Sequence, residues 1–455
     1  MRIAMIGGGY VGLVSAACFA EFGTEVSVVE THPVRLSALQ RGEIPIYEPG
    51  LDKLVGDNIE AGRLSFGNDI ALAVAGADAI FIAVGTPPRN GDGHADLTYV
   101  FAAAEQVARA MTGYAVIVTK STVPVGTGRR IAEIIRHLRP ELEFDVASNP
   151  EFLREGSAIG DFMKPDRVVI GTDTDQPGGT ERAQEIMRRL YRPLYVIEAP
   201  ILFTSLESSE LIKYASNSFL AMKISFINEM ADLCERVGAD VHELARGIGM
   251  DERIGRKFLH AGPGYGGSCF PKDTLALMRI AQEAGASSRL VEATVQVNDA
   301  RKASMGARIM SACGGSVRGK TIAVFGLTFK PETDDMRDAP SIPIIHRLIE
   351  NGAQIRTFDP AGMVAARPLL PAHKITYCAD AIDAATGADA LLVLTEWNEF
   401  RAVSPEQLRG LMTGNIVIDL RNIWEPGSMA QAGFVYSSIG RPERRTRLDV
   451  GIAVA

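Results

Sequence analysis

The fold is decided by residues 1–30, which read MRIAMIGGGYVGLVSAACFAEFGTEVSVVE. Ile3–Ile6 and Glu25–Val29 are short apolar runs typical of buried strands, and a helix-length segment begins between them near Tyr10. A strand, a glycine-rich turn, a helix and a second strand make a βαβ unit, whose strands are expected to be parallel. This unit predicts a doubly wound α/β sheet.

The same alternation of strands and helices continues to about residue 200 and returns after about residue 318. Further strands are expected at Ala79–Val84, Ala115–Thr119, Asp145–Ser148, Thr321–Phe325, Gln354–Phe358, Leu391–Leu394 and Ile416–Leu420. Residues 206–238 instead carry an apolar stripe with steps of three and four, at Leu211, Ala215, Phe219, Met222, Phe226, Met230 and Leu233. We therefore predict two Rossmann-like doubly wound parallel-sheet domains (1–200 and 316–440), joined by a long central helix and a helical middle domain (201–315), with a tail at 441–455.

Composition excludes several classes of protein. The 455 residues are 46% hydrophobic and 22% charged, as expected for a globular protein, and the net charge of −8 argues against binding to nucleic acid or to an acidic membrane. Five cysteines and seven histidines show no disulfide, zinc or other metal-ligand spacing, which indicates a metal-free protein of the reducing cytoplasm. Glycines interrupt the apolar N-terminus, and no apolar run is long enough to span a bilayer, so neither a signal peptide nor a membrane helix is expected.

The glycine-rich turn predicts a dinucleotide site. Gly7, Gly9 and Gly12 form the pattern G-x-G-x-x-G between a strand and a helix, and Glu30 stands 18 residues further on, at the end of the next strand. The helix N-terminus offers N–H groups to a pyrophosphate, and a carboxylate at Glu30 accepts from ribose hydroxyls while repelling a 2′-phosphate. NAD or FAD is therefore expected, with NAD favoured over NADP; Arg35 is the one dissenting residue, although a solvated helix arginine also accounts for it.

Residues 262–273, GPGYGGSCFPKD, indicate a reactive cysteine. Cys269 is expected just before a helix over Thr274–Ala284 that Pro271 begins, and next to Lys272. A helix N-terminus and a neighbouring ammonium both favour the thiolate, which is the nucleophilic form. Asp273 either takes part in the chemistry or only complements the helix dipole, and the residues leave both interpretations open.

Polar loops follow three of the strands at one sheet edge, where ligands bind in such folds. They carry Gly85-Thr86-Pro87, Lys120–Pro124, and Glu151 with Glu155. Lys213 and Asn217 share one face of the long helix, opposite the apolar stripe. From this pattern alone, Lys213 and Asn217 are expected in solvent and the stripe in the core.

Taken together, the motifs resemble the nucleotide-sugar dehydrogenases of the UDP-glucose/GDP-mannose dehydrogenase family, from residue 1 to about residue 440. The resemblance is carried by Gly7–Gly12, Ser121–Pro124, Ser148–Gly156, Lys213 with Asn217, Gly262–Asp273, Phe325–Lys330 and Arg337. GDP-mannose enzymes carry a longer loop before the cysteine, and amino-sugar enzymes usually carry His where Ser268 stands, so UDP-glucose is the favoured substrate.

The resemblance implies oxidation of the sugar C6 alcohol to a carboxylate in two steps, with two NAD consumed and UDP-glucuronate formed. A thiohemiacetal on Cys269 would hold the aldehyde, and a thioester would then be hydrolysed. The catalytic residues would be Cys269, Lys213, Asn217, Asp273, Thr122 and Glu155. The resemblance leaves open which group takes the first proton from the alcohol.

The resemblance also implies the binding residues. NAD would meet Gly7, Gly9, Val11, Gly12, Glu30, Arg35, Thr86, Thr122, Glu155, Lys272 and Arg337. The UDP-sugar would meet Glu151, Phe152, Leu153, Arg154, Glu155, Lys213, Asn217, Phe258, Leu259, His260, Ala261, Gly262, Gly266 and Lys330. Arg253 would reach the ligand of a neighbouring subunit, which implies a homodimer, or a higher homo-oligomer, built around the long helix.

Three other hypotheses remain. The enzyme could act on GDP-mannose or a UDP-N-acetyl amino sugar, the chain could be a nucleotide sensor without activity, or Cys269 could act with His260 as a hydrolase. A panel of substrates tests for the other sugars. Binding without NADH formation would indicate the sensor, and sensitivity to alkylation that does not depend on NAD would indicate the hydrolase.

Overall fold

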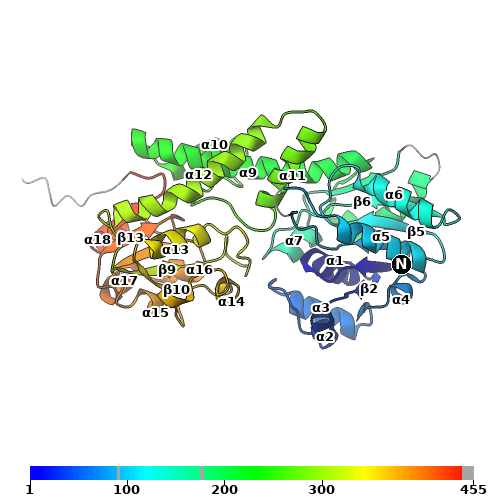
Figure 1. Ribbon diagram of the computed structural model, residues 1–455, viewed down its shortest axis with the longest axis horizontal. Helices are drawn as coiled ribbons and strands as arrows, with labels where there is room; N and C mark the ends of the chain where they lie inside the picture. The colour runs from blue at the N-terminus through cyan, green and yellow to red at the C-terminus, as the bar shows by residue number, and fades with distance from the viewer. Residues whose placement is uncertain (90–92, 175–178, 443–455) are drawn as a thin grey trace, which may run out of the picture. The chain divides into compact units, whose positions relative to one another are not determined.

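The computed structural model describes residues 1–89, 93–174 and 179–442. The chain divides into two compact units, which we call unit 1 (residues 1–216 and 275–286) and unit 2 (residues 217–274 and 287 onward). Helices α9 (Leu206–Val237) and α11 (Phe270–Glu283) each contribute residues to both units (Figure 1).

Unit 1 contains an eight-stranded sheet in the order β3-β2-β1-β4-β5-β6-β7-β8. Its strands are β1 (Arg2–Ile6), β2 (Glu25–Val29), β3 (Leu64–Gly67), β4 (Ala79–Ile82), β5 (Ala115–Thr119), β6 (Phe144–Ser148), β7 (Val168–Thr172) and β8 (Ile201–Ser205). The five strands expected here are all present, whereas β3, β7 and β8 were not expected. The expectation of a wholly parallel sheet is wrong at one pair, since β6 and β7 are antiparallel. The connection between them contains only the six-residue helix α7 (Ala158–Met163) and lacks the longer helix usual in a parallel crossover.

Helices cover both faces of this sheet because successive strand residues point to opposite sides. Ile3 and Met5 pack with one set of helices, and Ala4 and Ile6 with the other. The first set is α1 (Tyr10–Glu21), α3 (Leu51–Glu60), α7 and α8 (Gly179–Leu190), and the second is α4 (Ile70–Val74), α5 (Thr98–Ala110) and α6 (Thr127–Leu138). Helix α2 (Pro33–Gln40) and the 3-10 helix η1 (Arg192–Ile197) complete the described elements of the unit.

Unit 2 contains a six-stranded parallel sheet in the order β11-β10-β9-β12-β13-β14. Its strands are β9 (Thr321–Phe325), β10 (Gln354–Phe358), β11 (Ile375–Tyr377), β12 (Ala390–Val393), β13 (Ile416–Asp419) and β14 (Val435–Ser438). Its other helices are α10 (Val241–Gly249), α12 (Arg289–Ala312), α13 (Ser341–Glu350), α14 (Met363–Ala366), η2 (Ala372–Lys374), α15 (Ala381–Ala385), α16 (Asn398–Ala402), α17 (Pro405–Leu411) and α18 (Pro426–Gln431). The four expected strands are confirmed, and β11 and β14 are additional. The strand order repeats that of the first six strands of unit 1, so both predicted Rossmann-like sheets are present.

The long central helix is confirmed, but its burial is the reverse of what the pattern alone predicted. Phe219 and Leu233 of the stripe are 57% and 49% exposed, whereas Lys213 on the opposite face is only 3% exposed. The buried face carries small hydroxyl side chains, and two of them, Ser209 and Ser225, are hydrogen-bonded. Ser209 donates to the backbone oxygen of Ser148, for example, at 3.1 Å. Hydrogen-bonded polar groups can be buried at modest cost, which leaves the apolar stripe exposed.

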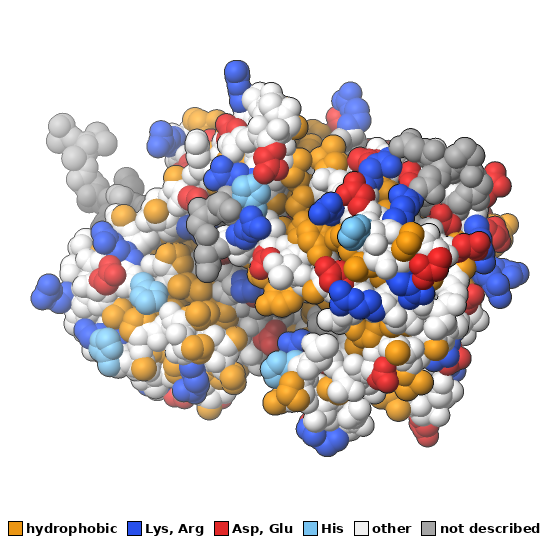
Figure 2. Space-filling view, turned by 45° about the vertical axis from the view of Figure 1, so that its right-hand side comes forward, with side chains coloured by type: hydrophobic (Ala, Val, Ile, Leu, Met, Phe, Trp, Pro, Cys, Tyr) orange, Lys and Arg blue, Asp and Glu red, His pale blue; other side chains and the backbone are white. Residues whose placement is uncertain are grey.

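Two surface properties bear on function. Figure 2 shows basic and acidic side chains interspersed on the face it draws, with no continuous basic area there. Within residues 1–89, 93–174 and 179–442, no helix is both long and apolar enough to cross a bilayer. The apolar residues near the N-terminus lie in β1 and α1 of unit 1. Residues 443–455 of the predicted tail lie outside the described part.

Candidate active site

The glycine-rich turn brings β1, α1 and the end of β4 into close contact. Gly7 has φ +112°, and a Cβ there would lie 2.7 Å from the backbone oxygen of Ala83. A Cβ on Gly12 would lie 2.0 Å from the backbone oxygen of Gly7. By contrast, a Cβ at Gly9, which precedes α1, would meet nothing within 4 Å. The first and last glycines therefore close the turn, and the middle one leaves space for a phosphate beside the helix N-terminus.

Glu30 lies against this turn. A Cβ on Gly8 would come within 3.0 Å of Glu30 Oε2, and the carboxylate is held by the backbone N–H of His32 at 2.8 Å. Arg35 Nη1 lies 3.1 Å from Glu30 Oε2, so Arg35 is paired with the carboxylate and is not simply a solvated helix arginine. Glu30 is thus fixed where a ribose bound at the turn would reach it, and the site fits NAD.

The loops after β4 and β5 contact each other. Thr86 Oγ1 donates to the backbone oxygen of Thr122 at 3.0 Å, and Ser121 Oγ donates to that of Val84 at 2.6 Å. Glu210, from the first turns of α9, accepts from the N–H groups of Gly126 and Gly128 at 2.6 and 2.7 Å. The loop that carries Thr122 is therefore held at both ends.

Glu151 and Lys213 form a buried ion pair in unit 1. Lys213 Nζ lies 3.0 Å from Glu151 Oε1, and the two side chains are 3% and 5% exposed. The Phe152 ring packs beside them, with Lys213 Nζ 5.4 Å and Arg167 Cζ 3.7 Å from its centre. The expectation from the helix pattern that Lys213 faces solvent is wrong, because its ammonium is buried against the Glu151 carboxylate.

The rest of the 151–156 loop is fixed by carboxylates that sequence reasoning missed. Glu48 is buried and accepts from the N–H groups of Gly156 and Ala158, at 2.6 and 2.7 Å, and from the Tyr10 hydroxyl. Burial and the Glu48 carboxylate together raise the pKa of Tyr10, which therefore stays a donor. Glu48 thus connects the first turn of the dinucleotide helix to the loop of Glu155. The signal that could have found it is its place beside Pro49-Gly50, a turn before α3.

Asp161 plays a similar part for Arg154, another predicted substrate residue. It accepts from Arg154 Nε at 3.0 Å and from Arg154 Nη2 at 2.6 Å. The Arg154 guanidinium is therefore paired with Asp161. Leu153 is half-buried, and its backbone N–H donates to the Glu151 carboxylate.

A second cluster lies in unit 2, around Cys269. Asn217, the second α9 residue expected in solvent, is 7% exposed and donates from Nδ2 to Asp273 Oδ2 at 2.6 Å. The other oxygen of Asp273 lies 2.6 Å from Lys272 Nζ. Cys269 is half-buried, its Sγ lies 3.5 Å from Ser268 Oγ, and it directly precedes α11. The helix begins at Phe270, one residue before the expected start at Pro271.

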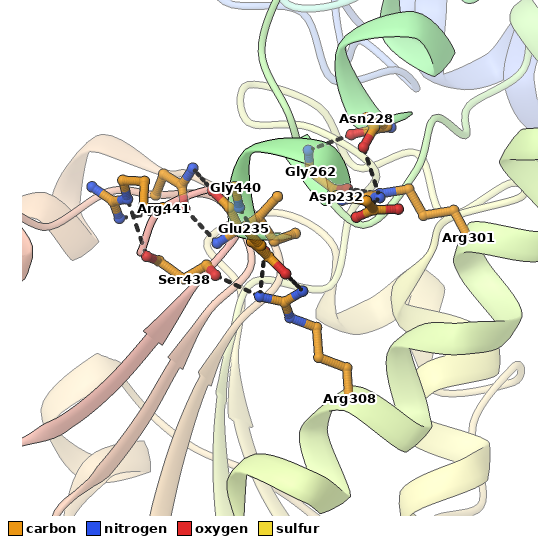
Figure 3. Close-up of polar contacts among 11 residues, drawn as sticks. Asn228, Asp232, Glu235, Gly262, Arg301, Arg308, Ser438, Gly440 and Arg441 are labelled. Carbon is orange, nitrogen blue, oxygen red and sulfur yellow. Dashed lines mark hydrogen bonds and ion pairs between the residues drawn. The ribbon is translucent and has the colours of Figure 1, made fainter. Parts of the chain in front are cut away.

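The glycine-rich segment before Cys269 is held by side chains from α9 and α12. Gly262 donates its N–H to Asn228 Oδ1 at 2.8 Å and accepts from Arg301 Nε at 2.6 Å (Figure 3). Both backbone groups of Tyr265 bond to the Asn298 side-chain amide, at 2.8 and 3.1 Å. Sequence reasoning missed Asn228, Asn298 and Arg301, because nothing in a helix sequence marks a polar residue that binds a distant backbone.

The following two glycines pack against the loop after β9. A Cβ on Gly266 would lie 2.4 Å from the backbone oxygen of Asp338, and one on Gly267 would lie 2.7 Å from the Phe329 ring. The Gly267 N–H donates to the backbone oxygen of Arg337 at 2.8 Å. The segment before Cys269 therefore packs, backbone against backbone, on the loop after β9 that carries Lys330 and Arg337.

The remaining predicted residues lie as follows. Val11 is half-buried in α1, Phe258 has φ +65° and is half-buried, Leu259 and Ala261 are buried, and His260 is exposed. Lys330 Nζ lies 5.5 Å from the centre of the Phe329 ring, and Arg337 pairs with Asp335 at 2.8 Å. Arg253 is 89% exposed and pairs with Asp251 at 2.6 Å. The Arg253 guanidinium therefore lies on the surface.

Comparisons with known proteins agree with this geometry. Three family models match the chain: the NAD binding domain over residues 1–195, the central domain over 207–300 and the UDP binding domain over 323–426 of the UDP-glucose/GDP-mannose dehydrogenase family. The UDP-glucose 6-dehydrogenase of Rhizobium meliloti (strain 1021) is 56% identical over 97% of this chain and 100% of its own, and UDP-glucose 6-dehydrogenase TuaD of Bacillus subtilis (strain 168) is 47% identical over 98% and 94%.

Solved structures show the same architecture. A UDP-glucose dehydrogenase from Pyrobaculum islandicum superposes with a TM-score of 0.86 at 39% identity, covering 96% of each chain. A UDP-D-ManNAc dehydrogenase from Pyrococcus horikoshii has a TM-score of 0.83 at 27% identity, covering 97% and 99% of the two chains. With its glycine-rich turn, its Cys269 segment and matches along nearly its whole length, the chain belongs to the UDP-glucose/GDP-mannose dehydrogenase family.

Proposed function

We propose that the chain is an NAD-dependent UDP-glucose 6-dehydrogenase. It converts UDP-glucose, water and two NAD into UDP-glucuronate and two NADH. The observation that carries the proposal is the buried arrangement around Cys269, in which a cysteine at the start of α11 is followed one turn later by Asp273, bonded to Asn217. Ser268 beside the cysteine and 56% identity to a UDP-glucose enzyme favour this sugar over GDP-mannose and the amino sugars. We assign one function to each of three sequence regions. Residues 1–200 bind NAD, residues 201–315 carry the catalytic cysteine, and residues 316–440 bind the UDP-sugar.

The first oxidation needs a base for the C6 hydroxyl, and we assign that proton to Lys213. Loss of the proton and transfer of a hydride from C6 give the aldehyde; bound NAD supplies the hydride acceptor. Asn217 and protonated Lys213 then stabilise an oxyanion at C6, since a buried donor is worth more there than in water. Lys213 and Asn217 suit a common task because they lie one turn apart on one face of α9.

The second oxidation needs a covalent intermediate. The Cys269 thiolate adds to the aldehyde carbon, and the thiohemiacetal loses a second hydride to give a thioester. Water then attacks the thioester; Asp273 accepts a proton from this water, and the Cys269 thiolate leaves. Thr122 and Glu155 assist at the cofactor and at the water.

The exposed α9 stripe supports a homodimer built around this helix. Phe219, Phe226 and Leu233 are 57%, 44% and 49% exposed, and a row of large apolar side chains on one helix is costly to leave in water. The five free cysteines fit a cytoplasmic enzyme.

The test is the number of NADH formed per UDP-glucose consumed, run to completion with NAD in excess. We expect a ratio near two, and no completed turnover with Cys269→Ser. A ratio near one would make Cys269 a bystander, and glucuronate formation by Cys269→Ser at the normal rate would refute the thioester. GDP-mannose and UDP-N-acetylmannosamine serve as comparison substrates, and Cys234→Ser, at a buried cysteine of α9, is the matched control.

A further inference from the structure

Glu48 is a buried acidic residue that the proposed chemistry does not use. It lies between α2 and α3 in unit 1 and is 7% exposed. It accepts hydrogen bonds from three neutral donors, the Tyr10 hydroxyl and the backbone N–H groups of Gly156 and Ala158. Within the described part of the chain, no lysine or arginine is paired with it. A carboxylate buried without a paired charge is costly and depends on its hydrogen bonds, so this arrangement calls for a reason.

A tight turn fixes the backbone of Glu48. Its carbonyl oxygen accepts from the Leu51 N–H at 3.1 Å, across Pro49 and Gly50. Gly50 has φ +81° and ψ 0°, and a proline followed by such a glycine is the pattern of a type II turn. Leu51 is fully buried in the core of unit 1. The turn therefore holds Glu48 at a defined place beside that core.

The Glu48 side chain binds the loop between β6 and α7 at two peptide groups. Gly156 donates to Oε2 at 2.6 Å, and its N–H belongs to the peptide bond that follows Glu155. Ala158 donates to Oε1 at 2.7 Å. Ser157, the residue before α7, makes no side-chain cap, so Glu48 supplies the acceptor for the first N–H of that helix. The backbone around Glu155 is thus held by Glu48.

The third bond connects this loop to the cofactor turn. Tyr10 is the first residue of α1 and directly follows Gly9, where the glycine-rich turn leaves space for a phosphate. The Tyr10 hydroxyl donates to Glu48 Oε2, which is the oxygen that also accepts from Gly156. A single oxygen atom therefore joins the first turn of α1 to the peptide that follows Glu155.

The packing of α1 on α7 does not account for this bond. The two helices are already joined by Phe19 and Phe162, whose rings meet edge to face with their centres 4.9 Å apart. Such apolar contacts stabilise the pair without burying a charge. A carboxylate adds short, directional bonds on both sides, and these fix position more closely than apolar packing does. Position matters at a reacting centre, because a misplacement of about 1 Å can cost about 100-fold in rate.

We propose that Glu48 is a positioning residue, which through Gly156 and Tyr10 aligns the loop of Glu151 and Glu155 with the cofactor turn for hydride transfer. The proposal rests on the proposed function, in which this loop contacts both UDP-glucose and NAD. Glu48 acts through its two neighbours and exchanges no proton with the substrate.

Glu48→Gln tests the hold on the loop. Oε1 and Oε2 each accept from a backbone N–H, so a glutamine in either orientation turns its NH2 group against one of these donors. We expect kcat/KM for UDP-glucose to fall by about 10- to 100-fold. The dissociation constant of NAD alone should change little, since the glycine-rich turn and Glu30 remain. Glu60→Gln, the same substitution at an exposed residue of α3, is the matched control and should keep the original kinetics.

Tyr10→Phe distinguishes positioning from simple capping of α7. It removes the bond to the cofactor turn and leaves the bonds from Gly156 and Ala158 in place. If Glu48 only capped α7, this variant would turn over normally. We expect instead that kcat falls by about two- to tenfold, as for the loss of one hydrogen bond, while KM for UDP-glucose is unchanged. With UDP-glucose deuterated at C6, the isotope effect on kcat should be at least as large as in the unsubstituted protein, because hydride transfer is the step that is slowed.

An unchanged kcat in Tyr10→Phe would overturn the proposal, as would an unchanged kcat/KM in Glu48→Gln with a lowered thermal midpoint. A calorimetric titration with UDP-glucose alone needs no turnover and separates the proposal from the function on which it rests. Glu48→Gln should bind UDP-glucose more weakly than the unsubstituted protein, and Tyr10→Phe should bind it equally well. These binding results in a protein that forms no NADH from UDP-glucose would support the action of Glu48 on the loop and reject the proposed function.

Discussion

Asn217 donates from Nδ2 to Asp273 Oδ2 at 2.6 Å, although 56 residues separate the two in the chain. Both are buried, and Lys272 Nζ lies 2.6 Å from the other carboxylate oxygen. This relationship joins the long helix to the first turn of α11, one turn after Cys269. It leaves Asp273 as a fixed acceptor one turn from the cysteine, and the proposed hydrolysis of a thioester calls for an acceptor at such a position.

Asp273→Asn should stall the enzyme after both hydride transfers. The amide keeps an oxygen for one of the two bonds but cannot take a proton from water, so kcat should fall by about 10²–10⁴-fold. Stopped-flow absorbance at ~340 nm, the NADH band, should show a burst approaching two NADH per active site and then a slow phase. An unchanged steady-state rate in this variant would show that Asp273 takes no part in the reaction.

Glu30→Ala should weaken NAD binding. The carboxylate is fixed beside Gly8, and losing charge-assisted hydrogen bonds to the ribose costs about 1.5–3 kcal/mol, or roughly 10- to 150-fold in the dissociation constant. Preference for NAD over NADP should shrink at the same time, because the repulsion of the 2′-phosphate is gone. Calorimetric titration of both cofactors measures this. Glu25→Ala, at an exposed residue of β2, is the control and should bind NAD normally.

Gly266→Ala should displace the Cys269 segment. Its Cβ would fall 2.4 Å from the backbone oxygen of Asp338, so either the segment or the loop after β9 has to move. Since both are backbone, we expect a loss of about 1–3 kcal/mol in unfolding free energy, as for overpacking, together with a changed rate of Cys269 alkylation by iodoacetamide. Gly113→Ala, where a Cβ meets nothing within 4 Å, should change neither. Native stability and reactivity in Gly266→Ala would contradict the packing described above.

Glu210→Gln should flatten the dependence of stability on pH. Burial raises the pKa of Glu210 from 4.5 to about 7, against the bonds from Gly128 and Gly126, which lower it. Between these values the folded protein binds a proton that the unfolded chain has lost, so stability falls as pH rises from about 4.5 to 7, by roughly 3 kcal/mol, and stays lower above that. Glutamine cannot ionise, so thermal midpoints at about pH 5 and 8 should lie closer together in the variant.

Glu207, three residues earlier on α9, serves as a control because its pKa is shifted in the opposite direction from that of Glu210. Partial burial acts to raise its pKa, but hydrogen bonds from Arg129, the backbone and Ser205, together with the charge of Arg129, outweigh burial and lower the pKa. Its ionised form therefore stabilises the fold, and that contribution is present at neutral pH and lost on acidification. Glu207→Gln should consequently lose more stability at about pH 7 than at pH 3. If both variants shifted in the same direction, the assignment to Glu210 would be wrong.

Phe226→Asp should break the proposed homodimer. Phe226 is 44% exposed in the middle of the α9 stripe, and a carboxylate there would be buried without a partner in a stripe-to-stripe interface. Light scattering coupled to size exclusion should show a monomer at concentrations where the parent is a dimer. Leu72→Asp, at a residue of α4 that is 70% exposed, should leave the mass unchanged. If the unsubstituted protein were itself a monomer, the proposed homodimer would be wrong.

The sequence by itself determined the elements whose signal is local. Glu25–Val29, Ala115–Thr119 and the long helix were predicted to within a residue, since apolar periodicity and glycine turns act over neighbouring residues. The spacing of Gly7, Gly9 and Gly12 likewise located the dinucleotide turn, and glycines with Lys272 singled out Cys269 among five cysteines.

Only the tertiary structure decided which side of α9 is buried, and therefore that Lys213 and Asn217 lie inside. A periodic pattern separates two faces of a helix but does not say which face finds partners, and here Glu151 and Asp273 come from distant segments. The antiparallel β6–β7 pair and the Glu48 bonds to the 151–158 loop depend in the same way on contacts across long stretches of chain. Burial and the pairing of polar groups depend on residues far apart in the chain, and here they place inside the protein a lysine that the pattern assigns to solvent.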